Sequence, residues 1–225
     1  MTPTPSPHEV LRLLEAHYGP LPDRHTRDPL AELIQTILSQ NTSDANSGRA
    51  FNQLWRTFGS WEAIARAPVA AVAEAIRSGG LGQVKAPRIQ AVLKRIREER
   101  GDFSLSFLTE MPLEEARRWL VSLPGVGPKT AACVLLFSLD LPALPVDTHV
   151  HRVARRLGLV GDKVSAEKAA TLLEGMVPPE DIYRFHVYLI EHGRRLCKAQ
   201  RPHCRECPLL DGCPTGQEVA GRPRR

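Results

Sequence analysis

The sequence predicts an all-α protein, and three observations lead to that prediction. Apolar residues recur with a helical period along most of the 225-residue chain. Glycine or proline stands at the ends of most of these stretches, as is common at helix termini. No segment alternates between polar and apolar residues as a half-buried strand would, and no repeat of 20 to 50 residues occurs.

The helical stripes can be followed in chain order. Asp28 and Pro29 predict the start of a helix, as N-cap and first helical residue. Ser165 predicts the start of another, and a Pro-Pro pair at 178–179 precedes the last long helix, which we expect to run to about His192. The clearest apolar stripes cover residues 30–38, 69–76, 89–96 and 150–157.

The charge of the chain is unevenly distributed. The formal net charge is +5 and the isoelectric point is about 9.1. Residues 191–225 carry eight Lys or Arg against four acids, which indicates a polyanionic partner for this end. Aromatic residues make up 5% of the chain, too few for a platform that stacks single-stranded bases. With no long apolar run and no signal-peptide pattern, we expect a cytoplasmic protein without membrane contact.

Four of the five cysteines lie close together near the C-terminus. They are separated by six, two and five residues, and they are Cys197, Cys204, Cys207 and Cys213. Nothing indicates secretion, so a shared metal centre is favoured over disulfides. The spacing alone leaves zinc and a [4Fe–4S] cluster open. Cys133 lies in an apolar helix, where we expect it to serve packing only.

The segment LPGVGPKTA, residues 123–131, predicts a tight turn leading into a helix. Gly125 and Gly127 permit unusual backbone angles and the close approach of a ligand. A helix that begins at Pro128 would present its first N–H groups to an anion such as a phosphate. The alternative interpretation is a linker that needs glycine for its geometry alone.

Lys129 and Asp147 are the candidate chemical groups. Lys129 falls in the first helical turn, where the helix dipole disfavours a cation. Partial burial there would favour the neutral and nucleophilic form of an amine. A lysine that contacts a phosphate would fit the same position. Asp147 precedes a helix as an N-cap, and a capping carboxylate can also serve chemistry.

Together these motifs resemble the endonuclease III family of base-excision DNA glycosylases, in the helix-hairpin-helix/Gly-Pro-Asp superfamily. The hairpin, the segment VDTHVHRV and the four-cysteine loop occur in the family's order and at its separations, from about Asp28 to Cys213. The resemblance implies a two-lobed all-α fold. A six-helix lobe would span 23–141, and 1–22 with 142–225 would form an iron–sulfur cluster lobe, with 1–7 and 215–225 flexible. The four cysteines would hold a [4Fe–4S] cluster.

The resemblance also implies an activity. Lys129 would attack the deoxyribose C1′, expel the base and form a Schiff base, after which β-elimination cuts the strand. Asp147 would support the positive charge that develops at the sugar. The expected enzyme is a monomeric DNA glycosylase/AP lyase that removes oxidised or ring-saturated pyrimidines from double-stranded DNA.

The remaining site residues come from the family's DNA contacts. In the hairpin and the cluster loop, the expected contacts are Gly125, Val126, Gly127, Thr130, Lys198, Arg201 and Arg205. Asn41 and Leu81 match positions that fill the gap left by the extruded base. The alternatives are solvated surface charges for the basic residues and a contact at a helix end for Leu81.

The sequence departs from the family pattern at three positions; the first two leave the lesion and the opposite-base preference open, and the third removes one possible DNA contact. Asn41 replaces a glutamine, Gly82 follows Leu81 where a tyrosine is usual, and Pro128 replaces a common arginine. Two other functions compete with the first. Lys129 and the short segment after Cys213 disfavour a monofunctional adenine or mismatch glycosylase, and Lys129 together with Asp147 disfavours a non-catalytic DNA-binding or redox-sensing protein.

Overall fold

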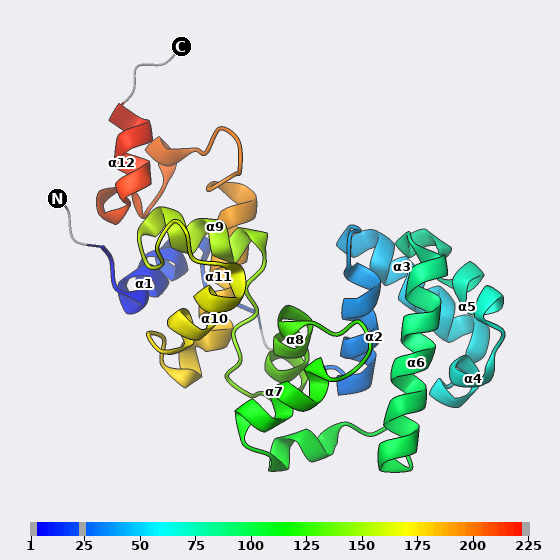
Figure 1. The fold of residues 1–225 in the computed structure, drawn as a ribbon. Coiled ribbons are helices and arrows are strands. Elements are labelled where there is room, and N and C mark those ends of the chain that lie inside the picture. The colour runs from blue at the N-terminus through cyan, green and yellow to red at the C-terminus, as the bar shows by residue number, and fades with distance from the viewer. Residues whose placement is uncertain (1–3, 23–25, 222–225) are drawn as a thin grey trace. The chain divides into compact units, whose positions relative to one another are not determined.

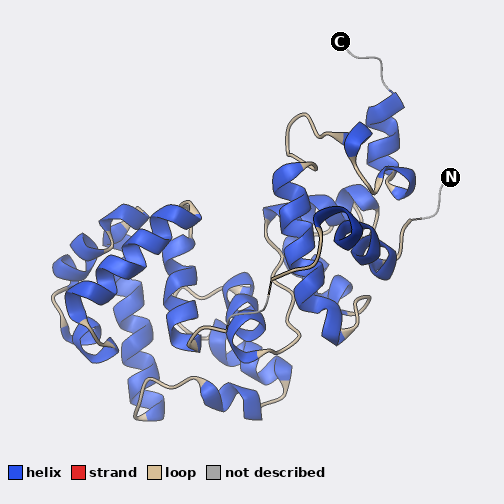
Figure 2. Ribbon diagram, turned by 180° about the vertical axis from the view of Figure 1, so that it is seen from behind, coloured by secondary structure: helices blue, strands red, loops and turns tan. Residues whose placement is uncertain are grey.

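The computed structural model describes residues 4–22 and 26–221, and every regular element in them is a helix (Figure 2). This confirms the predicted all-α class. The chain divides into two compact units. One is Thr26–Leu141, and the other combines the described residues that precede and follow it. None of the described helices is long and apolar enough to cross a membrane.

The continuous unit is built from seven α-helices and two short 3-10 helices, drawn from blue to green in Figure 1. Its elements are α2 (Pro29–Ser39), α3 (Asp44–Phe58), α4 (Trp61–Arg66), α5 (Val69–Ala75), η1 (Arg77–Gly79), α6 (Gly82–Arg100), η2 (Ser106–Glu110), α7 (Leu113–Val121) and α8 (Pro128–Leu139).

Helices α2 and α8 lie side by side and form the most extensive helix pair of this unit (Figure 1). Asp28 caps α2, because its Oδ1 accepts a hydrogen bond from the Ala31 N–H at 2.9 Å, and Pro29 takes the first helical position as predicted. The apolar stripe of α2 is fully buried. Helix α8 is apolar on nearly all sides, which suits a helix packed between neighbours.

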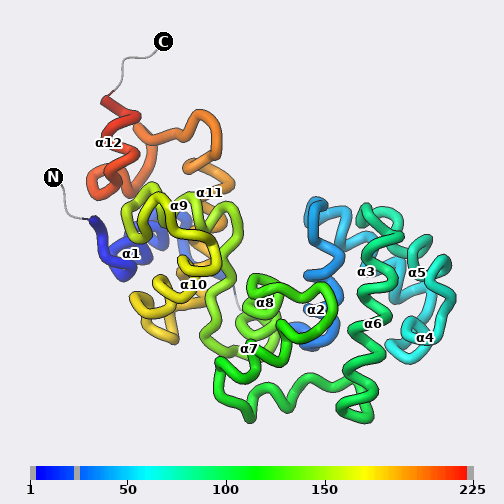
Figure 3. Tube along the Cα trace, in the orientation of Figure 1, coloured from blue at the N-terminus to red at the C-terminus, as the bar shows by residue number. Residues whose placement is uncertain are grey.

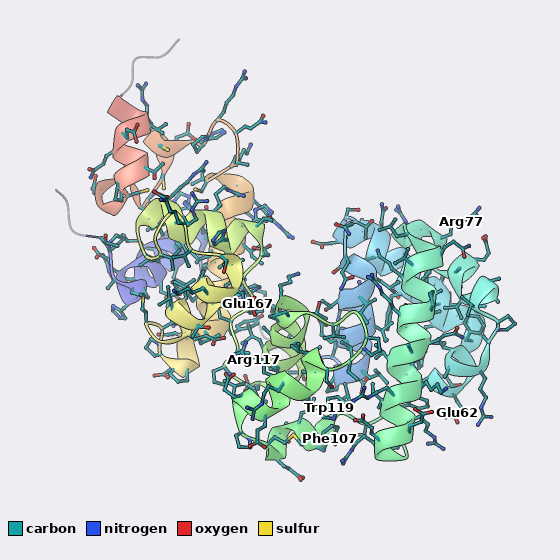
Figure 4. All side chains as sticks on the ribbon, viewed as in Figure 1. Glu62, Arg77, Phe107, Arg117, Trp119 and Glu167 are labelled. Carbon is teal, nitrogen blue, oxygen red and sulfur yellow. The ribbon has the colours of Figure 1, made fainter. Side chains whose placement is uncertain are left out.

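The first helix of the hairpin, α7, is anchored by Trp119. Its ring lies edge-on to Phe107 of η2, with 5.0 Å between ring centroids, and both side chains are labelled in Figure 4. The Trp119 Nε1–H also donates to Glu99 Oε2 on α6, at 3.2 Å. These contacts fix the approach to the turn that leads into α8.

The second unit contains α1 (Pro7–Tyr18), α9 (Thr148–Leu157), α10 (Ala166–Glu174), η3 (Pro179–Asp181), α11 (Ile182–Arg195), η4 (Cys204–Glu206), η5 (Leu210–Gly212) and α12 (Pro214–Gly221). Helix α11 packs against both α9 and α1, and α12 packs against α9 and η4. Gly158 ends α9, and Ser165 caps α10, as predicted.

The ends of the chain differ in part from expectation. Residues 214–221 form α12, where the sequence suggested a flexible segment from 215 onward. Gly216 explains the close packing of this helix, because a Cβ there would meet the Cys213 Sγ at 3.2 Å. Residues 1–3, 23–25 and 222–225, which include three arginines of the basic end, lie outside the described residues.

Candidate functional site

The hairpin turn lies between α7 and α8, and Figure 3 traces it along the Cα path. Gly125 has φ +75, a left-handed angle that favours glycine, whereas Gly127 has φ −96. A Cβ on Gly125 would meet the Arg88 Cδ at 2.9 Å, but one on Gly127 would meet no atom within 4 Å. Gly125 is therefore required by the turn, and Gly127 leaves open space at the helix entrance.

The N-terminus of α8 has the features of an anion site. Pro128 has no N–H, and no side chain caps the helix. The first backbone bond of the helix is donated by Ala131 to the Gly127 carbonyl at 3.0 Å. The N–H groups of Lys129 and Thr130 precede that bond and lie where a helix leaves its donors without an intrahelical partner.

Lys129 is exposed at this helix entrance. The side chain is thus open to solvent. Burial raises the pKa of Glu32 on α2, and nearby groups, first Arg27 and least Lys129, offset part of that rise. Sequence reasoning missed Glu32, since only the packing of α2 on α8 brings the two together.

Two of the expected hairpin contacts have buried side chains. Val126 is 5% exposed, and its N–H donates to the Leu123 carbonyl at 3.1 Å, so both of its groups serve the turn itself. A DNA contact by Val126 stays a prediction. Thr130 is also 5% exposed, which leaves its backbone N–H as the group that can face a phosphate.

The loop after α2 presents Asn41 next to the hairpin. Asn41 is exposed and has φ 56, an unusual angle for a residue other than glycine. The neighbouring Gln40 donates from Nε2 to the Gly125 carbonyl at 3.3 Å, which ties this loop to the hairpin turn. The contact spans 85 residues of sequence, so no local pattern could have revealed it.

The second loop presents Leu81 in the same unusual conformation. Leu81 has φ 53 and is 54% exposed, at the start of α6. Gly82 is explained by close packing on α5, because a Cβ there would meet the Ala73 carbonyl oxygen at 2.8 Å. Two exposed residues with left-handed backbones thus stand at the two positions proposed to fill the DNA stack. Strain of this kind is often retained where function requires it.

Asp147 begins α9 in the second unit. Its Oδ1 accepts hydrogen bonds from the N–H groups of His149 and Val150, each at 2.8 Å, which confirms the predicted N-cap. Capping therefore uses one of the two carboxylate oxygens. The extended segment before it is held by His186, whose Nδ1 lies 2.8 Å from the Pro145 carbonyl oxygen.

All four C-terminal cysteines line one pocket, which holds about 370 Å³ of empty space including space open to solvent. Three of the sulfurs have polar partners at hydrogen-bond distance, one of them Cys207 Sγ, which lies 3.5 Å from His192 Nε2. The Gly216 N–H lies 3.2 Å from Cys213 Sγ, and the Arg156 guanidinium lies 3.3 Å from Cys197 Sγ. Donors aimed at sulfur suit thiolates that ligate a metal centre.

Among the described residues, however, no three or more potential ligands lie close enough together to hold a metal ion as they stand. Burial raises the pKa of Cys207 to about 12, and it also raises the pKa values of Cys204 and Cys213. Cysteine ligates a metal as the thiolate, so loading a metal centre here would release protons. Cys133 is buried in α8, apart from this group.

Helix α9 anchors the loop that follows Cys197. Arg156 donates to the carbonyl oxygens of Lys198 and Ala199, at 2.7 and 3.0 Å. Arg152 donates to the Cys197 carbonyl at 2.9 Å. The loop is thereby fixed to the helix that Asp147 caps.

The three basic residues proposed for the cluster loop are exposed: Lys198, Arg201 and Arg205. Arg201 has φ 49, a left-handed angle on the loop between the first two cysteines. Arg205 donates to the Ala220 carbonyl at 3.2 Å and so also holds α12. Arg88, which lies against Gly125, is a further exposed cation beside the hairpin that sequence reasoning missed.

The fold and the site indicate the class of DNA-binding repair proteins with a helix-hairpin-helix. Three features lead to this class: a helical hairpin with a candidate anion site, a lysine in the first turn of its second helix, and a separate four-cysteine loop. Residues 34–179 match the family described as HhH-GPD superfamily base excision DNA repair protein. The chain belongs to this family.

Within this superfamily, the chain is similar to curated endonuclease III proteins. The chain is 35% identical over 190 residues to endonuclease III of Sulfolobus acidocaldarius, covering 84% of this chain and 82% of that protein. It is 38% identical over 191 residues to endonuclease III of Bacillus subtilis, covering 85% and 83%. An Arabidopsis thaliana protein named as a DNA glycosylase is 37% identical over 188 residues, covering 79% of this chain, which spans 64% of that protein.

The fold of the chain is also similar to solved structures of endonuclease III. A non-covalent complex of endonuclease III with DNA matches with a TM-score of 0.80 and 30% identity, covering 95% of both chains. A trapped covalent intermediate of endonuclease III with DNA matches with a TM-score of 0.81 and 30% identity, covering 95% of this chain and 96% of that one. The expected resemblance to the endonuclease III family is confirmed.

Proposed function

We propose that the chain removes oxidised or ring-saturated pyrimidines from duplex DNA and cuts the strand at the resulting abasic site. The endonuclease III relatives support a bifunctional DNA glycosylase and AP lyase of base excision repair. The observation that carries the residue assignment is the placement of Lys129, exposed in the first turn of α8 directly after the Gly125–Gly127 turn.

Lys129 is the proposed nucleophile. A DNA phosphate bound at the N-terminus of α8 would hold the sugar next to the Lys129 amine. The Nζ lone pair attacks C1′, the bond from C1′ to the base breaks, and the base leaves with a proton. Opening of the sugar ring gives a Schiff base between C1′ and Nζ, and loss of a C2′ proton then breaks the bond from C3′ to oxygen. The trapped covalent intermediate of a relative supports the use of such a step here.

Asp147 is the proposed partner in this chemistry. The carboxylate would stabilise positive charge as the bond to the base weakens. Its cap geometry keeps the side chain in place while leaving Oδ2 outside the capping bonds.

Base removal is tested with duplexes that carry single lesions. Wild-type protein should release 5,6-dihydrouracil and cut the strand, and it should also cut a preformed abasic duplex. Cutting of neither duplex would contradict the proposal. Cutting of the abasic duplex with no release from a panel of oxidised and saturated pyrimidines would overturn only the lesion class.

We also propose that Cys197, Cys204, Cys207 and Cys213 hold a [4Fe–4S] cluster. The shared pocket and the donors aimed at sulfur support this, and so does the resemblance of the cysteine spacing to that of the endonuclease III family. Such a centre would brace the loop that carries Lys198 and Arg201. We expect about four irons per chain and a yellow-brown protein after anaerobic purification. Colourless protein with stoichiometric zinc would contradict the assignment. We place the protein in the cytoplasm, associated with DNA.

A further inference from the structure

Lys85 is a buried lysine that the proposed chemistry does not use. It lies on α6 and is 1% exposed. Its Nζ donates to the Leu38 carbonyl oxygen at 2.6 Å and to the Gly79 carbonyl oxygen at 2.8 Å. Burying an ammonium group is unfavourable, and burial lowers the pKa of Lys85 accordingly. A methionine could fill similar space without that cost, so the two hydrogen bonds must explain the lysine.

The two carbonyls belong to the stems of the two loops proposed to fill the DNA stack. Leu38 lies three residues before Asn41, and Gly79 lies two residues before Leu81. The Lys85 backbone N–H also donates to the Leu81 carbonyl at 2.9 Å. One residue thus holds the base of the Leu81 loop through side chain and backbone and joins it to the end of α2.

Both loop tips need such support. Leu81 has φ 53, which is unfavourable for a bulky side chain, and Asn41 has φ 56, which asparagine adopts at a lower cost. Such conformations persist where the surrounding structure fixes them. The Gln40 bond to Gly125 fixes the first loop to the hairpin, and the Lys85 bonds fix the two loops to each other.

We propose that Lys85 is a positioning residue that sets Asn41 and Leu81 at the spacing required to enter the DNA stack together. This inference rests on the proposed function, because it assigns those two residues to stack filling. Lys85 acts through them and does not contact the reacting atoms.

The test compares Lys85→Met with Gln90→Met. Gln90 is a matched control on the same helix, since its Nε2 also donates to two backbone carbonyls, those of Ile64 and Ala67, at 2.8 and 2.7 Å. Those carbonyls lie at α4, away from the two loops. Each variant loses two side-chain hydrogen bonds to backbone carbonyls. Only Lys85→Met loses the bonds to Leu38 and Gly79, which precede the two loops.

The first readout is the ratio of dihydrouracil excision to cleavage of a preformed abasic duplex in single turnover. Misplacement of positioning groups typically slows a reaction by roughly 10- to 100-fold. We expect Lys85→Met to lower the ratio by about that factor and Gln90→Met to leave it unchanged. In a Leu81→Ala background, the effect of Lys85→Met should be smaller, because the part of it that passes through Leu81 is already lost. An unchanged ratio in Lys85→Met would overturn the proposal.

The second readout needs no catalysis. A duplex with 2-aminopurine opposite a tetrahydrofuran abasic analogue should fluoresce more strongly when saturating protein enters the stack. The rise should fall in Lys85→Met and persist in Gln90→Met. A full rise in Lys85→Met, or none with wild-type protein, would overturn the inference, whereas failure of the proposed function would appear as lost cleavage with the rise intact. Should Lys85→Met not fold, Lys85→Gln takes its place with the same expectations.

Discussion

Asp147 combines a folding role with a proposed chemical role in a single side chain. As an N-cap it satisfies two N–H groups of α9 through Oδ1. Asparagine caps helices about as well as aspartate, but it carries no charge. The two roles can therefore be separated by one conservative substitution.

Asp147→Asn should lower base excision by roughly 100-fold or more, because the stabilising charge is lost. Its Tm should stay close to that of wild-type protein. Asp147→Ala should lose the cap as well, at about 1 kcal/mol, and lower the Tm by roughly 2–4 °C. Single-turnover excision and thermal melts provide the measurements. Full activity in Asp147→Asn would reduce Asp147 to a cap alone.

At the scale of elements, the hairpin between α7 and α8 contains two glycines, and a different structural feature explains the glycine at each position. Gly125 is required by its φ of +75, a left-handed angle that favours glycine. Gly127 has an ordinary φ of −96 and open space around its Cα. The open space is where a DNA backbone would approach the N–H groups of α8.

Gly125→Ala should destabilise the protein by about 1–2 kcal/mol, because alanine is strained at this angle. Gly127→Ala should leave the stability of the unbound protein nearly unchanged and weaken duplex binding. Denaturant melts and binding titrations on both variants separate the effects. Unweakened binding by Gly127→Ala would show that the DNA backbone does not approach this position.

The helices and their caps could be predicted from sequence, whereas contacts between distant segments could not. The stripe of α2, the cap at Asp28 and the cap at Asp147 follow from local patterns and are observed. Lys85 lies in a polar stretch of α6, so its sequence context predicts a surface residue. In the structure its Nζ donates to the carbonyl of Leu38, which is distant in sequence. The same is true of Gln40 and Gly125. The burial of Val126 in the hairpin turn is likewise visible only in the structure.

At the scale of the whole molecule, the net charge of +5 favours DNA binding. Two groups of basic residues are candidates for the DNA contact. One is the loop with Lys198 and Arg201, which is exposed and fixed to α9. The other is the group of three arginines at 222, 224 and 225, which lies outside the described residues. Removing residues from 215 onward would delete most of α12, so substitutions are the suitable test.

Arg201→Ala should reduce the slope of log K against log salt by roughly 0.9, the value for one phosphate contact on duplex DNA. Damaged and undamaged duplexes should be weakened equally, because a backbone contact does not distinguish bases. Alanine at 222, 224 and 225 is the comparison, measured by titration at several salt concentrations. A slope lowered only by the second set would move the DNA contact from the cluster loop to the tail.

The central claim is that Lys129 forms a Schiff base with DNA, and borohydride trapping tests it most directly. Reduction of the C=N bond should give a stable adduct between wild-type protein and an abasic duplex, attached at Lys129 in the peptide map. Lys129→Ala should form none, whereas Lys94→Ala, which changes an exposed lysine paired with Glu98 on α6, should form as much as wild type. Undiminished trapping in Lys129→Ala would contradict the account.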